Sequence, residues 1–307
     1  MNNIYYKEPV YRPPSEAYSL LIQATEGCTY NCTFCIESIE RNFKIRPVKD
    51  IKQDIDTAKL IYGEDVRKLF FLAGNAFAMT FDRLLEITEY ANEVFPNLNR
   101  VSIYAQANDI LRKSDDELKS LAEAGLKMVY IGIETGNDEL LQKIEKQHTA
   151  NDMVEAFRKC YKAGITPSGT VILGLAGNDK ELSKQHMIDT ANLINRISPD
   201  NFIKSESLPF WYISCLALML IPGTPMNKEM LKNMFVLPTA VEVLAEMKIF
   251  LENISDDVQN CVFRSNHASN YLALKGKLSR DRNKLLDIVT QNINHQKNVR
   301  SEFYRAL

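Results

Sequence analysis

The sequence predicts an α/β fold: an incomplete barrel of six parallel strands, (β/α)6, followed by a C-terminal helical extension. Short apolar segments alternate with helical stretches of about ten to fifteen residues, which is typical of parallel strands joined by right-handed crossovers. Glycine and small polar residues follow each apolar segment, at the end where parallel barrels carry their chemistry. The chain has 307 residues and is 45% apolar, which is ample for a large core.

Six apolar segments are expected to form the strands. Most are short continuous runs, as expected for strands that are covered on both faces. They are Leu20–Ile22, Leu69–Leu72, Val101–Ala105, Met128–Ile133, Thr170–Leu173 and Leu216–Leu220.

Start and stop signals predict the helices. Proline can open a helix, glycine can end one, and a hydroxyl residue with glutamate three positions later forms a capping box. We expect helices from Pro47 to Tyr62, from Phe81 to Phe95, after the boxes at Ser114 and Thr239, up to Gly164, from Lys180 to Arg196, and from a cap at Ser279 to Asn292. The expected organisation is an N-terminal extension (1–17), a partial barrel (18–235) and a helical extension covering the barrel (236–307).

Composition disfavours nucleic-acid and membrane partners. The net charge is −2, with acids and bases interspersed, and no basic domain follows the barrel. The run from Cys215 to Ile221 is too short to span a bilayer, and residues 1–17 lack the apolar segment of a signal peptide. We therefore expect a cytoplasmic protein. Cys160, Cys215 and Cys261 are expected to be reduced, buried thiols.

The stretch from Glu26 to Cys35 carries the strongest chemical signal. Cys28, Cys32 and Cys35 have the spacing Cys-x3-Cys-x2-Cys, and thiolates select zinc or iron–sulfur clusters. A structural zinc site needs a fourth ligand, yet the first histidine is His148. Three thiolates on a four-iron cluster leave one iron open to chelate a small molecule and pass it an electron. A zinc site completed by a remote residue and three buried thiols are the alternatives.

This spacing, with Phe34 before the last cysteine and a strand before the loop, resembles the signature of the radical S-adenosylmethionine (SAM) superfamily. The resemblance implies that the three cysteines hold a [4Fe–4S] cluster, that its open iron binds SAM, and that Phe34 lies beside the adenine. Residues 220–225 and 263–271 are similar to stand-alone relatives of oxygen-independent coproporphyrinogen III oxidase. The arginine-rich substrate segment of that oxidase is not found here, so porphyrin is not carried over as the substrate.

Other strand exits match the family's SAM-binding segments. Gly74 and Asn75 stand where the family often has Gly-Gly-Glu, so a backbone contact to SAM is expected without the carboxylate. Glu134 resembles the acid that reaches SAM, with a surface-exposed acid as the alternative, and Gly169–Gly174 resembles the segment that packs on adenine. We expect Gln106, at the third exit, to face the same cofactors. Ordinary turn chemistry is the alternative for any single exit.

The insertion at residues 201–211 has two interpretations. It contains Trp211, the only tryptophan, and we expect a loop or lid whose tryptophan contacts the substrate. The alternative is a longer strand whose aromatic residues join the core.

A polar segment near the C-terminus is the candidate substrate site. Arg264 and His267 are the expected catalytic residues, with Asn266, Ser269 and Asn270 as substrate contacts. A guanidinium grips carboxylate or phosphate through two hydrogen bonds, and an imidazole exchanges protons near neutral pH. The alternative is a structural loop that ties down the C-terminal helices.

The resemblance implies an anaerobic radical SAM enzyme supplied with electrons by flavodoxin or ferredoxin. The reduced cluster would cleave SAM to methionine and a 5′-deoxyadenosyl radical, which abstracts hydrogen from a small-molecule substrate, while the protein orients the reactants and excludes water. A protein that keeps the fold but binds or delivers a cluster or haem is the alternative. RNA modification is disfavoured because no basic domain is present.

Overall fold

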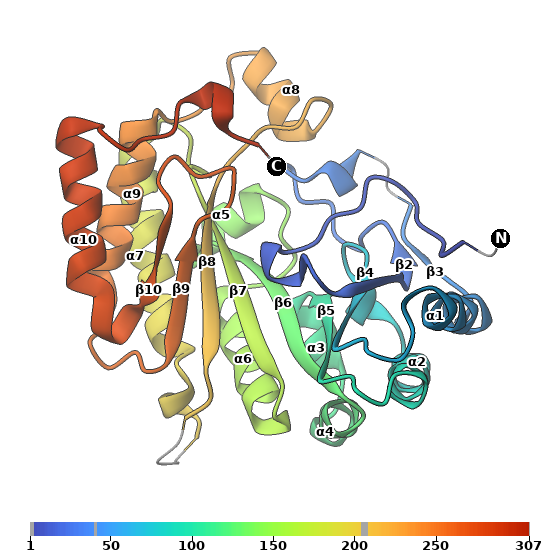
Figure 1. Ribbon diagram of the computed structural model, residues 1–307. Coiled ribbons are helices and arrows are strands. Elements are labelled where there is room, and N and C mark those ends of the chain that lie inside the picture. Colours follow the sequence, from blue (N-terminus) through green and yellow to red (C-terminus); the bar gives the residue numbers. More distant parts are fainter. Residues whose placement is uncertain (1–2, 40–41, 204–207, 307) are drawn as a thin grey trace.

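The computed structural model describes residues 3–39, 42–203 and 208–306. It confirms the α/β class: a twisted, mostly parallel sheet is covered by helices (Figure 1). Its strands, in spatial order, are β1 (Leu20–Gln23), β4 (Lys68–Leu72), β5 (Arg100–Ala105), β6 (Leu126–Glu134), β7 (Thr166–Leu173), β8 (Trp211–Ala217), β9 (Cys261–Ser265) and β10 (Leu274–Lys277). A separate antiparallel ribbon pairs β2 (Thr25–Glu26) with β3 (Lys44–Ile45).

The sheet has more strands than the six that were predicted. β9 pairs parallel with β8, and β10 then pairs antiparallel with β9 at the edge of the sheet. Alternate residues of β9 are buried, so one of its faces joins the core and the other stays partly open. The prediction missed β9 because its sequence contains a charged and a polar residue and was interpreted as part of a polar loop.

The predicted sixth strand was wrong in its bounds, and so was the assignment of Trp211 to the substrate. Trp211 is the first residue of β8 and is completely buried, with its indole Nε1 donating to the carbonyl of Gln259 at 2.8 Å. It lies at the amino end of β8. The cysteine loop lies at the opposite edge of the sheet, where it follows the carboxyl end of β1. Trp211 is therefore a core residue. Of the proposed lid, residues 204–207 lie outside the described residues.

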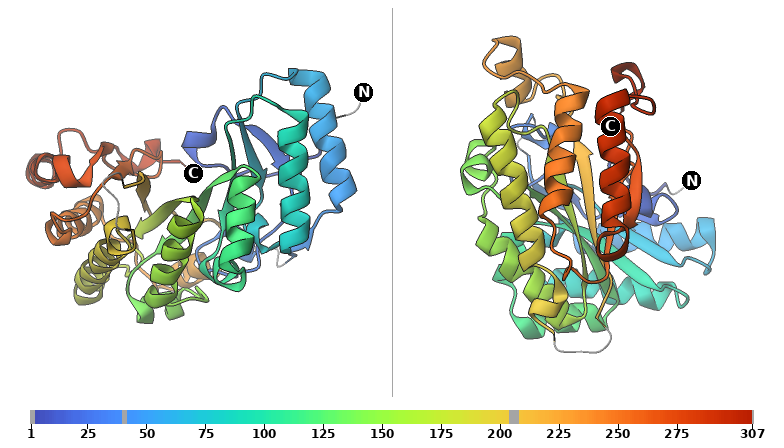
Figure 2. Two further views of the ribbon diagram at one scale, coloured as in Figure 1. Left: turned by 90° about the horizontal axis from the view of Figure 1, so that it is seen from below. Right: turned by 90° about the vertical axis from the view of Figure 1, so that its left-hand side faces the viewer.

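The main helices cover one face of the sheet in an arc (Figure 2). They are α1 (Val48–Tyr62), α2 (Phe81–Val94), α4 (Asp115–Glu123), α6 (Ala150–Ala163), α7 (Lys180–Arg196), α9 (Ala240–Asn253) and α10 (Leu278–His295), with α3 (Ala107–Arg112), α5 (Asp138–Lys143) and α8 (Pro225–Leu231) as shorter helices. Both predicted capping boxes are present, and Gly164 ends α6 in the left-handed conformation. The predicted cap at Ser279 was wrong, since α10 begins at Leu278.

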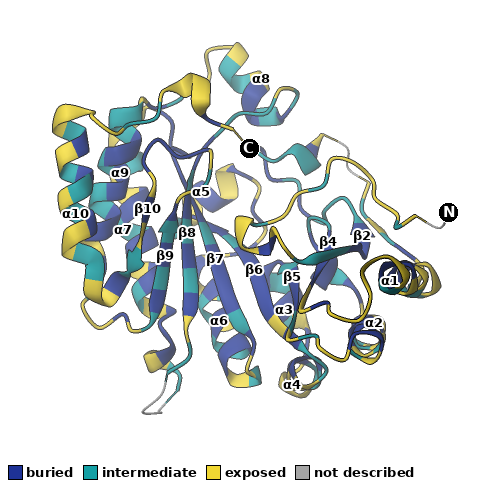
Figure 3. Ribbon diagram, viewed as in Figure 1, coloured by how far each residue is buried: buried dark blue, intermediate teal, exposed yellow. Residues whose placement is uncertain are grey.

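The core lies between the sheet and these helices, and the central strands β4 to β7 are mostly buried (Figure 3). Cys160, Cys215 and Cys261 are free thiols buried in this layer, as predicted. No helix in the part of the chain that the structure describes is long and apolar enough to cross a membrane.

We call the opposite face of the sheet the inner face. The N-terminal segment covers its β1–β6 side: Val10 packs on a cluster that includes Phe70 and Tyr130, and η1 (Pro14–Glu16) follows (Figure 1). Glu16 is completely buried, where its carboxylate accepts from Tyr130 and Arg100 at 2.5 and 2.6 Å. The predicted N-terminal extension is thus packed against the inner face of the sheet.

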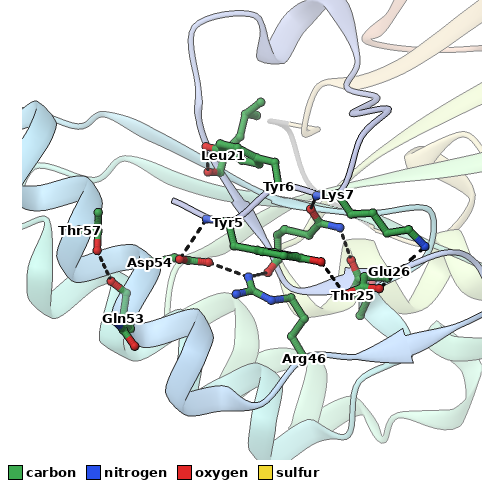
Figure 4. A network of polar contacts seen from close by, with 11 residues as sticks. Tyr5, Tyr6, Lys7, Leu21, Thr25, Glu26, Arg46, Gln53, Asp54 and Thr57 are labelled. Atoms are coloured by element: carbon green, nitrogen blue, oxygen red, sulfur yellow. Dashed lines mark hydrogen bonds and ion pairs between the residues drawn. The ribbon is translucent and has the colours of Figure 1, made fainter. Parts of the chain in front are cut away.

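A buried ion pair fixes the ribbon from which the cysteine stretch departs (Figure 4). Arg46, just after β3, lies 2.7 Å from the carboxylate of Asp54 on α1, and its guanidinium also donates to the carbonyl of Gln23 at 2.5 Å. The ring of Tyr5 lies 4.4 Å from that guanidinium, and the backbone N–H of Tyr5 donates to Asp54. Removal of one partner of such a buried pair costs about 3–5 kcal/mol, so the contact holds the ribbon firmly.

Candidate active site

The cysteine loop, residues 27–38, leaves the ribbon at Gly27. This glycine has φ +69°, and a Cβ atom there would lie 2.7 Å from the carbonyl oxygen of Asn42. Backbone hydrogen bonds hold the loop on two sides: Thr33 N–H donates to the carbonyl of Ile144 at 3.0 Å, and Met226 N–H donates to the carbonyl of Thr33 at 3.0 Å. The loop is therefore clamped between the end of α5 and the start of α8.

Cys32 is buried, and Cys28 and Cys35 are partly buried. Cys28 Sγ accepts from the backbone N–H of Tyr30 at 3.5 Å and from the side-chain amide of Gln106 at 3.9 Å. Burial raises the pKa of Cys28, raises that of Cys32 to about 11 and raises that of Cys35 to about 12. The free thiols are therefore protonated near neutral pH, and binding to iron requires that they lose these protons.

The polar groups beside the cysteine loop leave hydrogen-bonding capacity for a bound group. Next to Cys28, the Oε1 atom of Gln106 and the Oδ1 atom of Asn75 are buried and lack hydrogen-bond partners, so the site has acceptors to spare for a bound group.

The exit of β4 packs directly against the cysteine loop. A Cβ atom on Gly74 would lie 3.0 Å from the Cβ of Cys28, so a side chain there would press on the loop and glycine favours this close approach. Asn75 is buried, and its amide donates to Thr29 Oγ1 and to Asp109 Oδ2, both at 2.6 Å. The side chain of Asn75 thus positions the loop. A carboxylate, which the family often has at this place, could not donate these two hydrogen bonds.

Glu134, at the end of β6, is buried rather than surface-exposed. It has φ +61°, and one carboxylate oxygen lies 2.7 Å from the ammonium of Lys146. A Cβ atom on Gly132 would lie 2.0 Å from Glu134 Oε1 and 2.7 Å from Lys146 Nζ, so the pair occupies the space that a side chain would fill. Burial alone would lower the pKa of Lys146, but Glu134 and the nearby thiols Cys32 and Cys28 raise it. Sequence reasoning missed Lys146, since it lies in a loop with no local signal.

Two further buried polar groups lie beside this pair. The ring of His148 lies 6.5 Å from that of Tyr30, and both its nitrogens lack partners among the described residues, as does the hydroxyl of Tyr30. Burial, assisted by Lys146, lowers the pKa of His148 to about 3, so its imidazole is neutral. Neither residue was predicted to be at the site.

An apolar cluster lies next to the loop. Phe34 packs against a buried group that includes Ile172 and Leu175, at the exit of β7. The structure thus brings together the two segments that the family resemblance assigns to adenine, Phe34 and the run that ends at Gly174.

A helix of the C-terminal extension holds that same exit. The backbone N–H of Gly174, which has φ +88°, donates to Glu246 Oε2 on α9 at 2.6 Å, and Ser183 Oγ donates to Oε1 at 2.6 Å. Burial raises the pKa of Glu246 to about 7 despite these two hydrogen bonds. Glu246 was not predicted because its partners are about 60 to 70 residues away in the chain.

The residues of the polar C-terminal segment differ in burial: Ser269 and Asn270 are buried, whereas the other candidates are at least partly exposed. Asn270 is buried and donates to the carbonyl of Cys215 at 2.9 Å; Ser269 is buried beside His267 Nδ1 at 3.0 Å. The prediction that Ser269 and Asn270 contact a substrate was therefore wrong, because their polar groups hold the loop. Arg305 and Arg300 bind carbonyls of this loop, so the tail is packed and not loose.

The remaining predicted residues stay accessible. Arg264 is partly buried on the inner face, where its guanidinium donates only to the carbonyl of Phe263 at 2.8 Å within the described residues. Asn266 is exposed and His267 is partly buried. Burial, together with Arg300, lowers the pKa of His267, so its imidazole is neutral near pH 7.

The sequence was compared with family models and with known proteins, and the cysteine loop lies within the region that matches. The sequence matches the model of the Radical SAM superfamily over residues 22–187. It is 26% identical over 226 residues to the tRNA-2-methylthio-N(6)-dimethylallyladenosine synthase of Hahella chejuensis, covering 69% of this chain and 46% of that protein. It is 26% identical over 175 residues to the heme chaperone HemW of Bacillus subtilis, covering 53% of this chain and 44% of that protein. The chain thus spans about half the length of the curated relatives it matches.

Solved structures share the fold. Coproporphyrinogen III oxidase (HemN) from Escherichia coli superposes with a TM-score of 0.54 at 16% identity, covering 76% of this chain and 52% of that one. At this identity the likeness extends to the arrangement of strands and helices alone.

The Glu246 carboxyl gives a pH-dependent test of the β7 exit. Its pKa is raised from 4.5 to about 7 in the folded protein, so the folded state binds more protons than the unfolded state in this interval, and stability falls as pH rises through it. Glu246→Gln keeps an acceptor for Gly174 but cannot ionise. We expect this variant to show a flatter profile of melting temperature against pH, and to have a higher melting temperature than the wild type above pH 7. Glu252→Gln, at an exposed position of the same helix, is the control; a wild-type slope retained in Glu246→Gln would contradict the assignment.

Proposed function

Because the chain belongs to the radical SAM superfamily, we propose that it is an enzyme that cleaves SAM reductively and abstracts hydrogen from a small-molecule substrate. The observation that carries the proposal is the cysteine loop: Cys28 lies against the exits of β4 and β5, and Cys32 lies near Glu134 at the end of β6. The cofactors are those of the family, a [4Fe–4S] cluster and SAM. When bound, they supply the electron transfer and C–S cleavage that start the reaction.

Cys28, Cys32 and Cys35 would hold the cluster. Lys146 places a positive charge near Cys28 and Cys32, which offsets part of the negative charge that thiolate ligands bring to the site. The clamp on Thr33 and the contact of Gly74 with Cys28 keep the loop in position. The reducing partner, as in the family, would be a protein such as flavodoxin or ferredoxin.

SAM would lie across the exits of β4 to β7. Glu134 has one oxygen on Lys146 and a second that no described residue donates to, which suits it to accept from a polar group of SAM. The backbone around Gly74 would bind the amino group, and Gln106 has a free acceptor nearby. Phe34 with the β7 exit would pack on the adenine, in a position that Glu246 fixes.

The substrate would carry a carboxylate or a phosphate. Arg264 offers a guanidinium that no carboxylate in the described ranges neutralises, and such a group binds oxyanions through paired hydrogen bonds. His267, with Nδ1 engaged by Ser269 and a neutral ring, would use Nε2 to bind the substrate or to move a proton. Asn266 would lie at the rim of this site.

A second candidate is suggested by one relative. The chain is similar to a protein named as a heme chaperone, so binding or delivery of a cluster or haem on the same fold is the alternative. The two candidates differ in whether SAM is consumed by the reduced protein.

Formation of 5′-deoxyadenosine separates these candidates. Protein reconstituted without oxygen and reduced with dithionite should convert SAM to methionine and 5′-deoxyadenosine, and Cys32→Ala, which removes one cluster ligand, should lose this reaction completely. Cys160→Ala, a buried thiol outside the loop, serves as the control and should retain it. Iron bound with no 5′-deoxyadenosine formed would favour the binding protein.

Glu134 is tested by SAM affinity. Glu134→Gln preserves the acceptor for Lys146 but removes the charge, and we expect SAM to bind several-fold more weakly while the iron content is unchanged, since a hydrogen bond to a charged group contributes about 1.5–3 kcal/mol. Calorimetric titration of the reconstituted protein measures this. Glu139→Gln, on the exposed face of α5, is the control, and equal affinity in the two variants would show that Glu134 serves only to pair with Lys146.

A further inference from the structure

We propose that the inner face of β7–β10 binds a phosphoryl group of the substrate through a row formed by Ser214, Arg264 and Lys275. The inference rests on the proposed function and deepens it, because it assigns the anion to a doubly charged group and to one place on the sheet.

Among the described residues, the N-terminal segment covers the β1–β6 side of the inner face more closely than the β7–β10 side. Val10 and η1 cover the strands from β1 to β6, and Glu16 is sealed there by Arg100 and Tyr130. On β7, Ser168 and Ile172 are buried on this face, but Thr170 between them is partly exposed. The side chains on the same face of β8 and β9 are all partly exposed: Tyr212, Ser214, Leu216, Val262 and Arg264. These strands therefore offer a substrate accessible polar side chains on the inner face.

Strand register aligns the polar side chains. Thr170 pairs with Ser214, Ser214 pairs with Arg264, and Arg264 pairs with Lys275. Residues paired in this way point to the same face of the sheet, and neighbouring strands lie about 4.8 Å apart. A hydroxyl, a guanidinium and an ammonium thus stand side by side across β8, β9 and β10, within the reach of one oxyanion.

The charge of this row favours phosphate over carboxylate. Arg264 and Lys275 form no ion pair with any described carboxylate, and Lys277 lies on the same face two residues further along β10. The ammonium of Lys277 lies 4.6 Å from the ring of Phe210, so the row itself has two cations. Two cations with a hydroxyl donor match a dianion with three terminal oxygens, whereas a carboxylate would use the guanidinium alone. The sites are on strands, which hold such donors more rigidly than loops do.

The row also sets the direction of the substrate. Gly132 of β6 pairs with Thr170, so Thr170 continues the row toward the SAM side. Glu134 is two residues further along β6, about 7 Å at the rise of a strand, and two strand spacings separate Arg264 from Thr170, about 10 Å. The phosphoryl group would thus lie over β9, and the reacting carbon over β7, near the cofactor end.

Inorganic phosphate is the probe for this site. We would titrate it into the reconstituted, SAM-bound protein by calorimetry, with ionic strength held constant by chloride because exposed charges are screened by salt. Phosphate should bind to the wild type in the millimolar range and more tightly than acetate. Arg264→Gln should weaken binding at least about tenfold, since a charge-assisted bidentate contact is lost.

Two further variants keep the result interpretable. Lys275→Gln, at an exposed position on the edge strand, should weaken phosphate binding in the same direction if Arg264→Gln fails to fold. Arg83→Gln carries the same charge change on the exposed side of α2 and should bind phosphate like the wild type.

Contrary results would each have a distinct meaning. Equal phosphate binding by wild type and Arg264→Gln, no binding by the wild type, or acetate binding as tightly as phosphate would overturn the inference. Wild-type protein that forms 5′-deoxyadenosine but does not bind phosphate would overturn the inference alone. A cluster-loaded protein that never cleaves SAM would overturn the proposed function.

Discussion

The buried ion pair between Glu134 and Lys146 is the contact on which the cofactor end of this barrel depends. A carboxylate at the end of a central strand is costly to bury unless it is paired, and the 2.7 Å contact supplies the pair. The positive φ of Glu134 and the missing side chain of Gly132 give the two groups room to meet. The same ammonium lies near Cys28 and Cys32, so one residue stabilises both the acid and the cysteine loop.

The N-terminal and C-terminal segments contribute to different sides of the inner face. The N-terminal segment fills the side over β1 to β6, with a completely buried Glu16 as its anchor. The C-terminal part adds β9 and β10, and its tail returns through Arg300 and Arg305 to hold the loop after β9. α9 also reaches the β7 exit through Glu246. The extension therefore contributes strands, support for the loop after β9 and a hydrogen bond to the β7 exit, rather than a helical cover alone.

Much of the architecture was predictable because its signals are local. The strands through β7, helix α7 and both capping boxes follow from runs of apolar residues and from caps a few residues apart. The cysteine spacing located the cofactor loop for the same reason. By contrast, Lys146, His148 and Glu246 matter only through contacts made in the folded chain, and β9 was hidden because half of its residues face a polar surface. The polar segment around Ser269 looked like a site because buried polar side chains that serve the backbone resemble those that serve a ligand.

The central claim is that the three cysteines leave one iron of the cluster open to SAM beside Glu134 and Lys146. Electron paramagnetic resonance of the dithionite-reduced, reconstituted protein tests it most directly. We expect one [4Fe–4S] signal per chain whose g-values shift when SAM is added, because SAM binds the open iron. A cluster signal that SAM leaves unchanged, or a protein that binds stoichiometric zinc and no iron, would contradict it.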